Sequence, residues 1–230
     1  MKLFASDYDG TFARSNRTPG EIEKNIIQVK QWREAGNLFI FATGRDVPGL
    51  LNVLPKHNGL KYDYLVCLNG GTITTHTGEI VLDKVIPQHL ANEIMTIVKE
   101  NNIQEYYIDH VTTNGTGKIS VFMDTPDEAL CIARLFAMHF EDRTSIFANE
   151  RCVDLTALGV SKATGVAQVA HRHNIAHKDI YCMGDSHNDI PMLAAYNGIT
   201  LPGVATAVNA AATQVCGSVG AALELLLAIP

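Results

Sequence analysis

The chain has 230 residues, of which 47% are hydrophobic and 18% are charged, which is the composition of an ordinary globular protein. Its formal net charge of −6 argues against nucleic acid as a partner, because phosphate backbones are bound by basic surfaces. No apolar run approaches the ~20 residues that a membrane-spanning helix needs, and acidic residues at Asp7 and Asp9 interrupt any signal-peptide core.

The first third of the chain predicts strands that alternate with helices. A buried strand over Lys2–Ser6 precedes a helix over Pro19–Ala35. Thr18 is expected to cap this helix and Gly36 to end it. Such alternation is typical of a parallel sheet with helices on its faces. The next two strands are expected over Leu38–Ala42 and Tyr64–Leu68.

A different order of elements follows, from about Pro87 to Ala157. A helix and two strands are followed by a second helix and two more strands, and this αββαββ order predicts an antiparallel sheet. We therefore predict an inserted cap domain over residues 84–157 and a core made of residues 1–83 and 158–230. The expected elements of the insertion are Pro87–Asn101, Glu105–His110, Lys118–Asp124, Pro126–Phe140, Thr144–Phe147 and Cys152–Thr156.

The alternation of strands and helices resumes after Gly159. A helix over Ser161–His173, capped by Ser161, leads to strands over Ile180–Met183 and Gly198–Leu201. The apolar segment Ala221–Ala228 is expected to be a terminal helix that packs on the core. The predicted fold class is α/β, with a Rossmann-like parallel sheet as the core and the αββαββ insertion as an α+β cap.

Polar and glycine residues follow four of the predicted strands. In open α/β sheets ligands gather outside the carboxyl ends of the strands, so these residues are expected to converge. The pair Asp7 and Asp9 is costly to bury unless a cation or a shared proton relieves its repulsion, although an Asp-Gly turn is the alternative. The four groups are Asp7–Thr11, Thr43–Arg45, Asn69–Gly71 and Gly184–Asp189.

Four segments of the chain resemble the four motifs of the haloacid dehalogenase (HAD) superfamily in their order and separations. They are Asp7-Tyr8-Asp9-Gly10-Thr11, Ala42-Thr43-Gly44-Arg45, Gly159-Val160-Ser161-Lys162 and Gly184-Asp185-Ser186-His187-Asn188-Asp189-Ile190-Pro191-Met192-Leu193. The insertion between the second and third segments resembles the type IIB cap of the Cof-like phosphatases. This resemblance covers essentially the whole chain and implies a phosphoric monoester hydrolase.

The resemblance also implies catalytic and metal-binding roles. Asp7 would be the nucleophile that forms an aspartyl-phosphate intermediate, and Asp9 the general acid and then the general base. The cofactor would be Mg2+, which prefers oxygen ligands. The side chains of Asp7 and Asp185 and the backbone carbonyl of Asp9 would bind it, and Asp189 would be a further ligand or would orient the others. Helix capping is the alternative for Asp185 and Asp189.

A second set of residues would bind the substrate phosphate. The resemblance implies this role for Thr43, Lys162 and Asn188, with backbone N–H groups of Gly10 and Gly44 as further donors. On local grounds Thr43 would equally suit a helix cap, and Lys162 a solvated surface lysine.

The segments leave three further side chains with open roles. Arg45 either steadies the second motif loop, reaches the substrate or forms a surface ion pair. His187 faces the cap or the solvent. Asn69 contacts phosphate or belongs to a plain turn.

Several other patterns are interpreted as structural. Gly115–Lys118 lacks the first glycine of a phosphate-binding P-loop, so Asn114–Gly115 is expected to be a hairpin turn. His171, His173 and His177 do not share one helix face, which argues against a metal site. The five cysteines are odd in number and scattered, which favours reduced thiols in a cytoplasmic protein over a disulfide framework.

The sequence therefore predicts a Mg2+-dependent phosphatase whose partner is a small phosphorylated metabolite. Sugar phosphates and phosphoglycolate-like acids are the expected substrate classes, with selectivity carried by cap residues such as Tyr106, Tyr107, His110 and Asn114. Two alternatives stay open, a phosphomutase of the phosphomannomutase type and a non-catalytic phosphosugar-binding regulatory module. The sequence does not indicate the oligomeric state.

Overall fold

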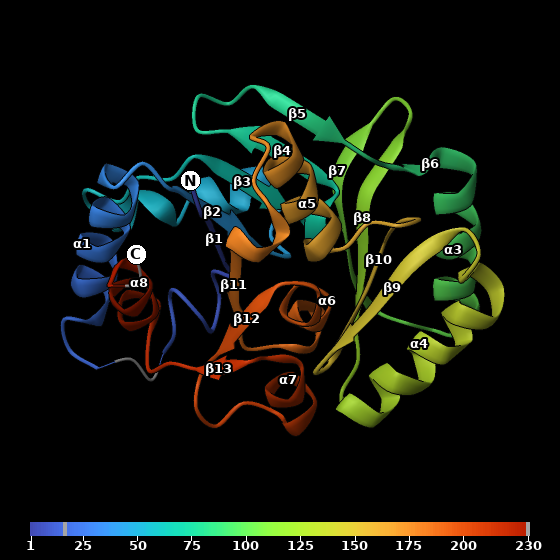
Figure 1. Cartoon of the computed structure of the whole chain (residues 1–230). Helices are drawn as coiled ribbons and strands as arrows, with labels where there is room; N and C mark the ends of the chain where they lie inside the picture. The colour runs from blue at the N-terminus through green and yellow to red at the C-terminus, as the bar shows by residue number, and fades with distance from the viewer. Residues whose placement is uncertain (16–17, 229–230) are drawn as a thin grey trace.

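The computed structural model describes residues 1–15 and 18–228, and its strands form two separate sheets. The larger sheet has the strand order β13-β12-β11-β1-β2-β3-β4-β5. The smaller sheet has the order β6-β8-β10-β9, with β7 paired to β8. Figure 1 shows the two sheets side by side, each with its own helices, and this arrangement bears out the predicted α/β core with an inserted cap.

The larger sheet is parallel over its six strands from β13 to β3 and antiparallel at the β4–β5 edge. Sequence analysis missed this edge hairpin, because its threonines and exposed apolar residues lack the continuous hydrophobic run of a central strand. The eight strands are β1 (Leu3–Ser6), β2 (Leu38–Ala42), β3 (Tyr64–Cys67), β4 (Thr72–Thr75), β5 (Ile80–Asp83), β11 (Ile180–Gly184), β12 (Asn197–Thr200) and β13 (Gln214–Val215).

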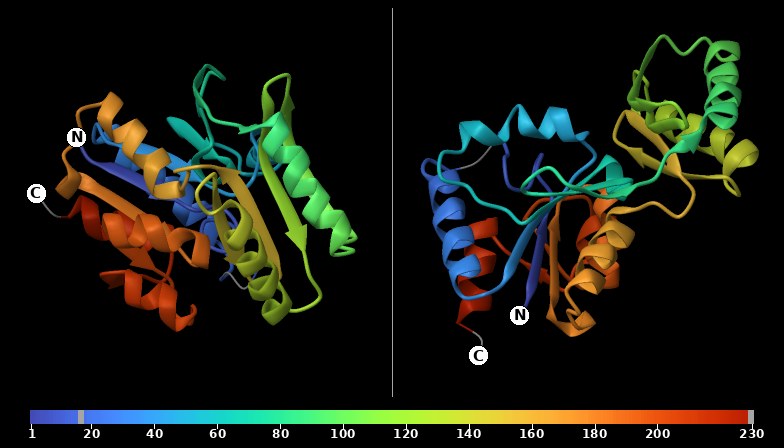
Figure 2. Two further views of the ribbon diagram at one scale, coloured as in Figure 1. Left: turned by 90° about the vertical axis from the view of Figure 1, so that its right-hand side faces the viewer. Right: turned by 90° about the horizontal axis from the view of Figure 1, so that it is seen from above.

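Helices cover both faces of the larger sheet, and its central strands are therefore apolar on both sides (Figure 2). In β1, Phe4 packs in the cluster beneath α1 and α8, whereas Leu3 and Ala5 pack in the cluster beneath α5 and α6. The helices of the core are α1 (Glu21–Glu34), α2 (Val47–Leu51), α5 (Lys162–Arg172), α6 (Ile190–Ala195), α7 (Thr206–Ala211) and α8 (Val219–Leu227). Short 3₁₀ turns occur at Leu54–Lys56, Leu68–Gly70, His177–Asp179 and His187–Asp189.

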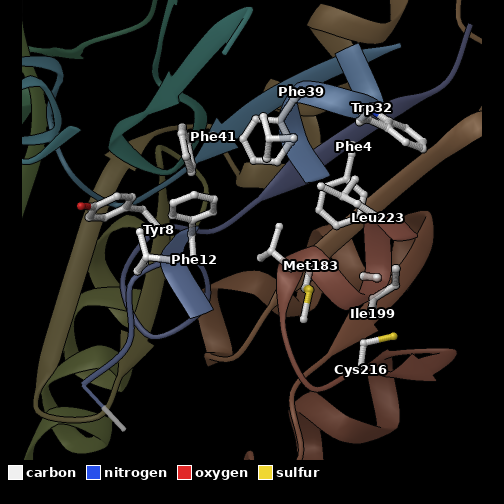
Figure 3. Close-up of a cluster of buried hydrophobic side chains, with 14 of the residues drawn as sticks. Phe4, Tyr8, Phe12, Trp32, Phe39, Phe41, Met183, Ile199, Cys216 and Leu223 are labelled. Carbon is white, nitrogen blue, oxygen red and sulfur yellow. The ribbon is translucent and has the colours of Figure 1, made fainter. Parts of the chain in front are cut away.

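A cluster of aromatic rings anchors the loop that follows β1. Phe12 lies at 5.1 Å, centroid to centroid, from Phe41 on β2 with its ring perpendicular, and Phe41 meets Phe39 at the same distance (Figure 3). Phe4 stacks on Phe39 at 6.0 Å. Edge-to-face and offset pairs of this kind add about 0.5–1.5 kcal/mol beyond their buried area. The turn containing Asp7 and Asp9 is therefore fixed at both ends, by β1 and by Phe12.

The first helix begins later than its sequence predicts. The prediction that Thr18 caps it was wrong, because the Thr18 N–H and hydroxyl both donate to the carboxylate of Glu21, at 3.2 and 3.3 Å. The capping position is instead Gly20, with a left-handed φ of 76° and no side-chain cap. Arg14 binds the same buried Glu21 carboxylate at 2.6 and 2.8 Å, so the Thr18 hydroxyl is engaged by this ion pair and does not cap the helix.

The smaller sheet is antiparallel and has the predicted αββαββ order, preceded by a short strand. Its elements are β6 (Ile86–Pro87), α3 (Gln88–Glu100), β7 (Glu105–Thr112), β8 (Gly115–Phe122), α4 (Pro126–Phe140), β9 (Thr144–Asn149) and β10 (Cys152–Ala157). The predicted hairpin joins β7 to β8, but its two-residue turn is Thr113–Asn114, one position earlier than expected, because Gly115 is already the first residue of β8 and pairs with Thr112. The domain limits at residues 84–157 stay a prediction.

The two faces of the cap sheet differ in chemistry because side chains alternate along each strand. Ile119 and Val121 of β8, with Val153 and Leu155 of β10, pack against α3 and α4 in one apolar cluster. The intervening residues of β8 and β10 occupy the opposite face, and these are Lys118, Ser120, Phe122, Cys152, Asp154 and Thr156. This second face is the one that borders the core.

Two further observations concern the chain as a whole. All five cysteines lie in the described part of the chain and are free, as expected. Among the described residues, no helix combines the length and the apolar character that crossing a membrane requires.

Candidate active site

The four predicted groups of polar residues converge at one edge of the core sheet. Ser6 of β1 is in register with Met183 of β11 and with Phe41 of β2, so the loops after these strands start at the same level. Asp7 continues this register, since its N–H donates to the Met183 carbonyl at 2.9 Å. The convergence predicted from strand ends is therefore present in the structure.

Asp7 is buried beside the ammonium group of Lys162. The Lys162 Nζ donates to Asp7 at 2.7 Å and to Asp189 at 2.6 Å, and all three residues are at most 5% exposed. Ser161 caps helix α5 through a capping box with Thr164, which fixes Lys162 at the first position of this helix. A fully buried lysine with two carboxylates is not the solvated surface residue that its local sequence also allowed.

Asp185 approaches Asp7 from the loop after β11. It accepts a hydrogen bond from the Thr11 hydroxyl at 2.5 Å and one from the Ser186 hydroxyl at 3.2 Å. Gly10 makes this approach possible, because it has a φ of 80° and a Cβ there would collide with the Asp185 carboxylate.

Asp189 holds the same loop together. One of its oxygens accepts the N–H groups of Asp185 and Ser186, at 3.0 and 2.9 Å, while the other binds Lys162. The carboxylate therefore serves both as the cap of a turn and as a charge partner. Of the two roles left open for Asp189, this bonding favours that of an orienting residue over that of a direct metal ligand.

Three of these carboxylates form a cluster suited to a metal ion. Ligand oxygens of Asp7, Asp185 and Asp189 all lie within 4.8 Å of one another. Burial raises the pKa of Asp7 well above its usual value, against the opposing effect of the Lys162 ammonium, and burial likewise raises the pKa of Asp185. One ammonium group cannot balance three carboxylates, and a set of hard oxygen donors with excess negative charge fits Mg2+.

Asp9 differs from this cluster in its surroundings. Its side chain is 53% exposed and accepts two hydrogen bonds from the Arg45 guanidinium, at 2.6 and 2.7 Å. Of the three roles considered for Arg45, the structure shows the ion pair, and its partner is the predicted acid. The Asp9 carboxylate is not a member of the metal cluster, and a role for its backbone carbonyl stays a prediction.

The predicted phosphate-binding residues line one cavity of about 600 Å³ together with Asp7 and Asp9. Thr43 is buried, and its hydroxyl oxygen accepts the Arg45 N–H at 3.2 Å, which leaves its own proton for a ligand. Asn188 is also buried and donates through Nδ2 to Asn69 at 3.1 Å. All five predicted phosphate-binding residues belong to the lining of this cavity, and they are Gly10, Thr43, Gly44, Lys162 and Asn188.

The cap supplies the upper wall of the same cavity through residues that sequence analysis missed. They are Lys118, Ser120, Phe122, Asn149, Glu150, Cys152 and Asp154. The alternation of polar residues at positions 118, 120, 152 and 154 was a signal that could have identified this face.

The four cap residues proposed from sequence are absent from this lining. His110 contacts Asp83 at 2.8 Å instead. His187 is exposed and borders a neighbouring cavity of about 540 Å³.

The chain matches the family model described as haloacid dehalogenase-like hydrolase over residues 4–113 and 109–221. Two curated proteins are similar over most of their length. The 5-amino-6-(5-phospho-D-ribitylamino)uracil phosphatase YbjI of Escherichia coli is 24% identical and covers 95% of this chain and 91% of its own. The phosphoglycolate phosphatase of Nitrosopumilus maritimus is 24% identical and covers 93% and 88%.

Solved structures share the fold at low sequence identity. A HAD/COF-like hydrolase from Plasmodium vivax superposes with a TM-score of 0.85 at 21% identity, covering 100% of this chain and 96% of its own. The HAD subclass IIB sugar phosphatase BT4131 superposes with a TM-score of 0.78 at 18% identity, covering 99% and 98%. The core sheet and the inserted antiparallel sheet are therefore those of the IIB fold.

Proposed function

Because this chain belongs to the haloacid dehalogenase-like hydrolases, as a Cof-like phosphoric monoester hydrolase of subclass IIB, we propose that it cleaves small phosphate monoesters with Asp7 as its nucleophile. One observation carries this proposal. A buried carboxylate is held by the single ammonium of Lys162, 2.7 Å away, at the end of a cavity that also contains the exposed Asp9. Two carboxylates in opposed surroundings suit two different catalytic roles.

In the proposed reaction, an Asp7 oxygen attacks phosphorus while the bond from phosphorus to the leaving oxygen breaks. Asp9 gives its proton to that oxygen. Asp9 then takes a proton from a water molecule whose oxygen attacks the phosphorus of the aspartyl-phosphate, which releases phosphate and restores Asp7. Arg45 donates one hydrogen bond to each Asp9 oxygen in this structure, and each oxygen keeps a second lone pair that can carry the proton.

The surrounding residues would hold the phosphoryl group in line. Lys162 keeps one Asp7 oxygen fixed by its hydrogen bond, and the Thr43 hydroxyl and the second N–H of Asn188 would donate to phosphate oxygens. Asp7 and Asp185 would hold Mg2+, with Asp189 as their orienting partner. When bound, Mg2+ would neutralise part of the charge of the transferring group.

The protein acts on small phosphorylated metabolites, and we propose sugar phosphates or phosphoglycolate-like acids as the particular class. The cavity of about 600 Å³ suits a compound of that size. The names of the relatives support both classes, one being a phosphoglycolate phosphatase and another a sugar phosphatase. They also favour hydrolysis over a phosphomutase reaction, and the presence of Asp9 argues against a module that only binds.

A purified-protein assay tests the proposal. We expect turnover of p-nitrophenyl phosphate in Mg2+, loss of turnover in EDTA and recovery when Mg2+ is added back. A panel of sugar phosphates and phosphorylated hydroxy acids would then identify the substrate class. Turnover that is indifferent to chelation would contradict the metal assignment, and the absence of turnover on every phosphate monoester would contradict the function.

A further inference from the structure

One chain of buried hydrogen bonds runs from the cap into the catalytic loops. Asp154 on β10 accepts the Asn69 Nδ2 at 2.9 Å, and Asn69 in turn accepts the Asn188 Nδ2 at 3.1 Å. These three residues are at most 8% exposed. The chain therefore joins the cap to the loop after β3 and then to the loop after β11.

The donor and acceptor directions in this chain are dictated by Asp154. An ionised carboxylate can only accept, so Asn69 must turn its amide nitrogen toward Asp154 and its amide oxygen toward Asn188. Asn188 must then direct its own nitrogen toward Asn69. The Asn188 Oδ1 is buried and has no hydrogen-bond partner among the residues that the structure describes, as expected if the carboxylate imposes the direction.

The imposed direction keeps the donor end of Asn188 beside the second motif loop. The Asn188 Nδ2 and the Asn69 Oδ1 are among the atoms nearest to the position that a Cβ of Gly44 would take, at 3.7 and 3.3 Å. One N–H of the Asn188 amide is used by Asn69, which leaves the other for a ligand in the cavity.

A second contact joins the same part of the cap to the same core loop. The Lys118 Nζ donates to the Gly44 carbonyl at 2.8 Å and lies 3.5 Å from Asp154 and 3.4 Å from Asp109. Burial alone would lower the pKa of this ammonium, but the two carboxylates raise it above its usual value. Lys118 is therefore charged, and it lies beside the same Asp154 carboxylate that accepts from Asn69.

We propose that Asp154 is a positioning residue for the phosphate site, which it orients through Asn69 and Asn188. The inference rests on the proposed function, because it requires Asn188 to contact the substrate phosphate. Asp154 would then affect the binding of the phosphate group in every substrate, whichever leaving group that substrate carries. The phosphate site is then complete only when the cap is seated on the core.

Asp154→Ala tests this role, with Asp109→Ala as its matched control. Both carboxylates flank the Lys118 ammonium at nearly equal distances, but only Asp154 is bonded to Asn69. We expect Asp154→Ala to raise the KM of p-nitrophenyl phosphate and of a metabolite substrate by the same factor, about tenfold. The inhibition constant of inorganic phosphate should rise in parallel, and Asp109→Ala should change each value less than threefold.

A double-mutant cycle with Asn188→Ala separates positioning from a general effect on the cap. If Asp154 acts through Asn188, the Asp154→Ala change should raise the KM and the inhibition constant of phosphate only slightly when Asn188 is already alanine. Additive losses, losses that differ between the two leaving groups, or equal effects of Asp154→Ala and Asp109→Ala would each overturn the proposal. If Asp154→Ala does not fold, Asp154→Asn replaces it in the same cycle, since an amide no longer imposes the direction.

Calorimetric binding of inorganic phosphate in Mg2+ measures the same effect without turnover. A wild-type protein that binds phosphate but hydrolyses no ester would contradict the proposed function while the cycle on phosphate affinity still decides the role of Asp154. Equal phosphate affinity in wild type and Asp154→Ala would overturn the positioning role alone.

Discussion

The core edge and the cap face meet at one cavity but are built in different ways. At the core edge, charged groups are buried against one another, as for Asp7, Lys162 and Asp189. Loops after parallel strands fix the two carboxylates, and the capped start of α5 fixes the lysine. On the cap face, polar and aromatic side chains occupy every second position of a strand, as Ser120 and Phe122 do on β8. In the proposed reaction, the first arrangement fixes the reacting atoms, and the second shapes the space for the rest of the substrate.

This difference predicts that substitutions at the core edge affect every substrate, whereas most substitutions on the cap face affect some substrates more than others. Asp154 and Lys118 are exceptions, because each lies on the cap face but is bonded to a core loop, and of the two Asp154 is the one bonded to Asn69. Kinetics on substrates with different leaving groups can therefore test the comparison residue by residue.

The largest effect is expected from Asp7→Asn. An amide oxygen is a poor nucleophile and cannot balance the Lys162 charge, so kcat should fall by about three orders of magnitude or more on every phosphate monoester. Steady-state kinetics with p-nitrophenyl phosphate would measure this loss. Asp127→Asn, in the exposed first turn of α4, is the control and should leave kcat unchanged. Near-normal turnover in Asp7→Asn would contradict the nucleophile assignment.

Asp9→Asn should have a smaller effect that depends on the leaving group. A general acid contributes about 10²–10⁴-fold, and most where the leaving alcohol is a poor one. We therefore expect kcat/KM, which excludes the hydrolysis step common to both substrates, to fall by about a hundredfold or more on an alkyl phosphate. It should fall by less on p-nitrophenyl phosphate, whose leaving group needs little protonation. Equal losses on both substrates would count against Asp9 as the acid.

The crowded carboxylates predict how stability depends on pH without metal. Burial raises the pKa of Asp7 and of Asp185 in the folded protein, so the folded state binds protons that the unfolded state has released. In EDTA, the free energy of unfolding should therefore decrease as pH rises from about 4, the value of an unperturbed Asp, through these raised values. Mg2+ should flatten this decrease, because it stabilises the ionised carboxylates.

Urea unfolding at a series of pH values, with EDTA or with Mg2+, would measure this dependence. Asp7→Asn removes one of the two groups and should reduce the slope in EDTA. An unchanged slope in this variant, or one that Mg2+ does not alter, would show that the carboxylates at the core edge are not coupled as the structure indicates.

The sequence was most informative where structure follows local rules. Asp7, Thr43 and Asp185 could be placed together because the carboxyl ends of parallel strands share an edge, and the β7–β8 hairpin could be placed to within one residue because Asn-Gly between two strand patterns is a turn signal. The start of α1 was predicted wrongly, since Glu21 and Arg14 form a pair that competes with the Thr18 cap.

The cap wall was missed for a different reason. Asp154 lies within a strand and not at its end, and its partner Asn69 is 85 positions away in sequence. No local pattern predicts such a contact, because it depends on how the cap is seated on the core. The same limit applies to Lys118, which the sequence associates with an incomplete P-loop and which the structure joins to Gly44.

The smallest effect, and the most selective, is expected from Phe122→Ala on the cap face. Phe122 lines the cavity and meets Tyr107 edge to face at 5.6 Å, so it offers an aromatic surface to the leaving group. Its loss should lower kcat/KM about tenfold for a ring-containing sugar phosphate, as expected for one apolar contact of about 1–3 kcal/mol, and less for phosphoglycolate, which has no ring to pack against it.

Tyr106→Ala is the matched control for this prediction. Tyr106 pairs with Val121, whose side chain lies on the helix-covered face of the cap sheet, so an equal loss of aromatic surface there should leave both substrates unaffected. A uniform loss on both substrates in Phe122→Ala would mean that the cap face holds the phosphate site together at more points than Asp154. Selectivity would then have to come from the neighbouring cavity beside Asn149 and His187.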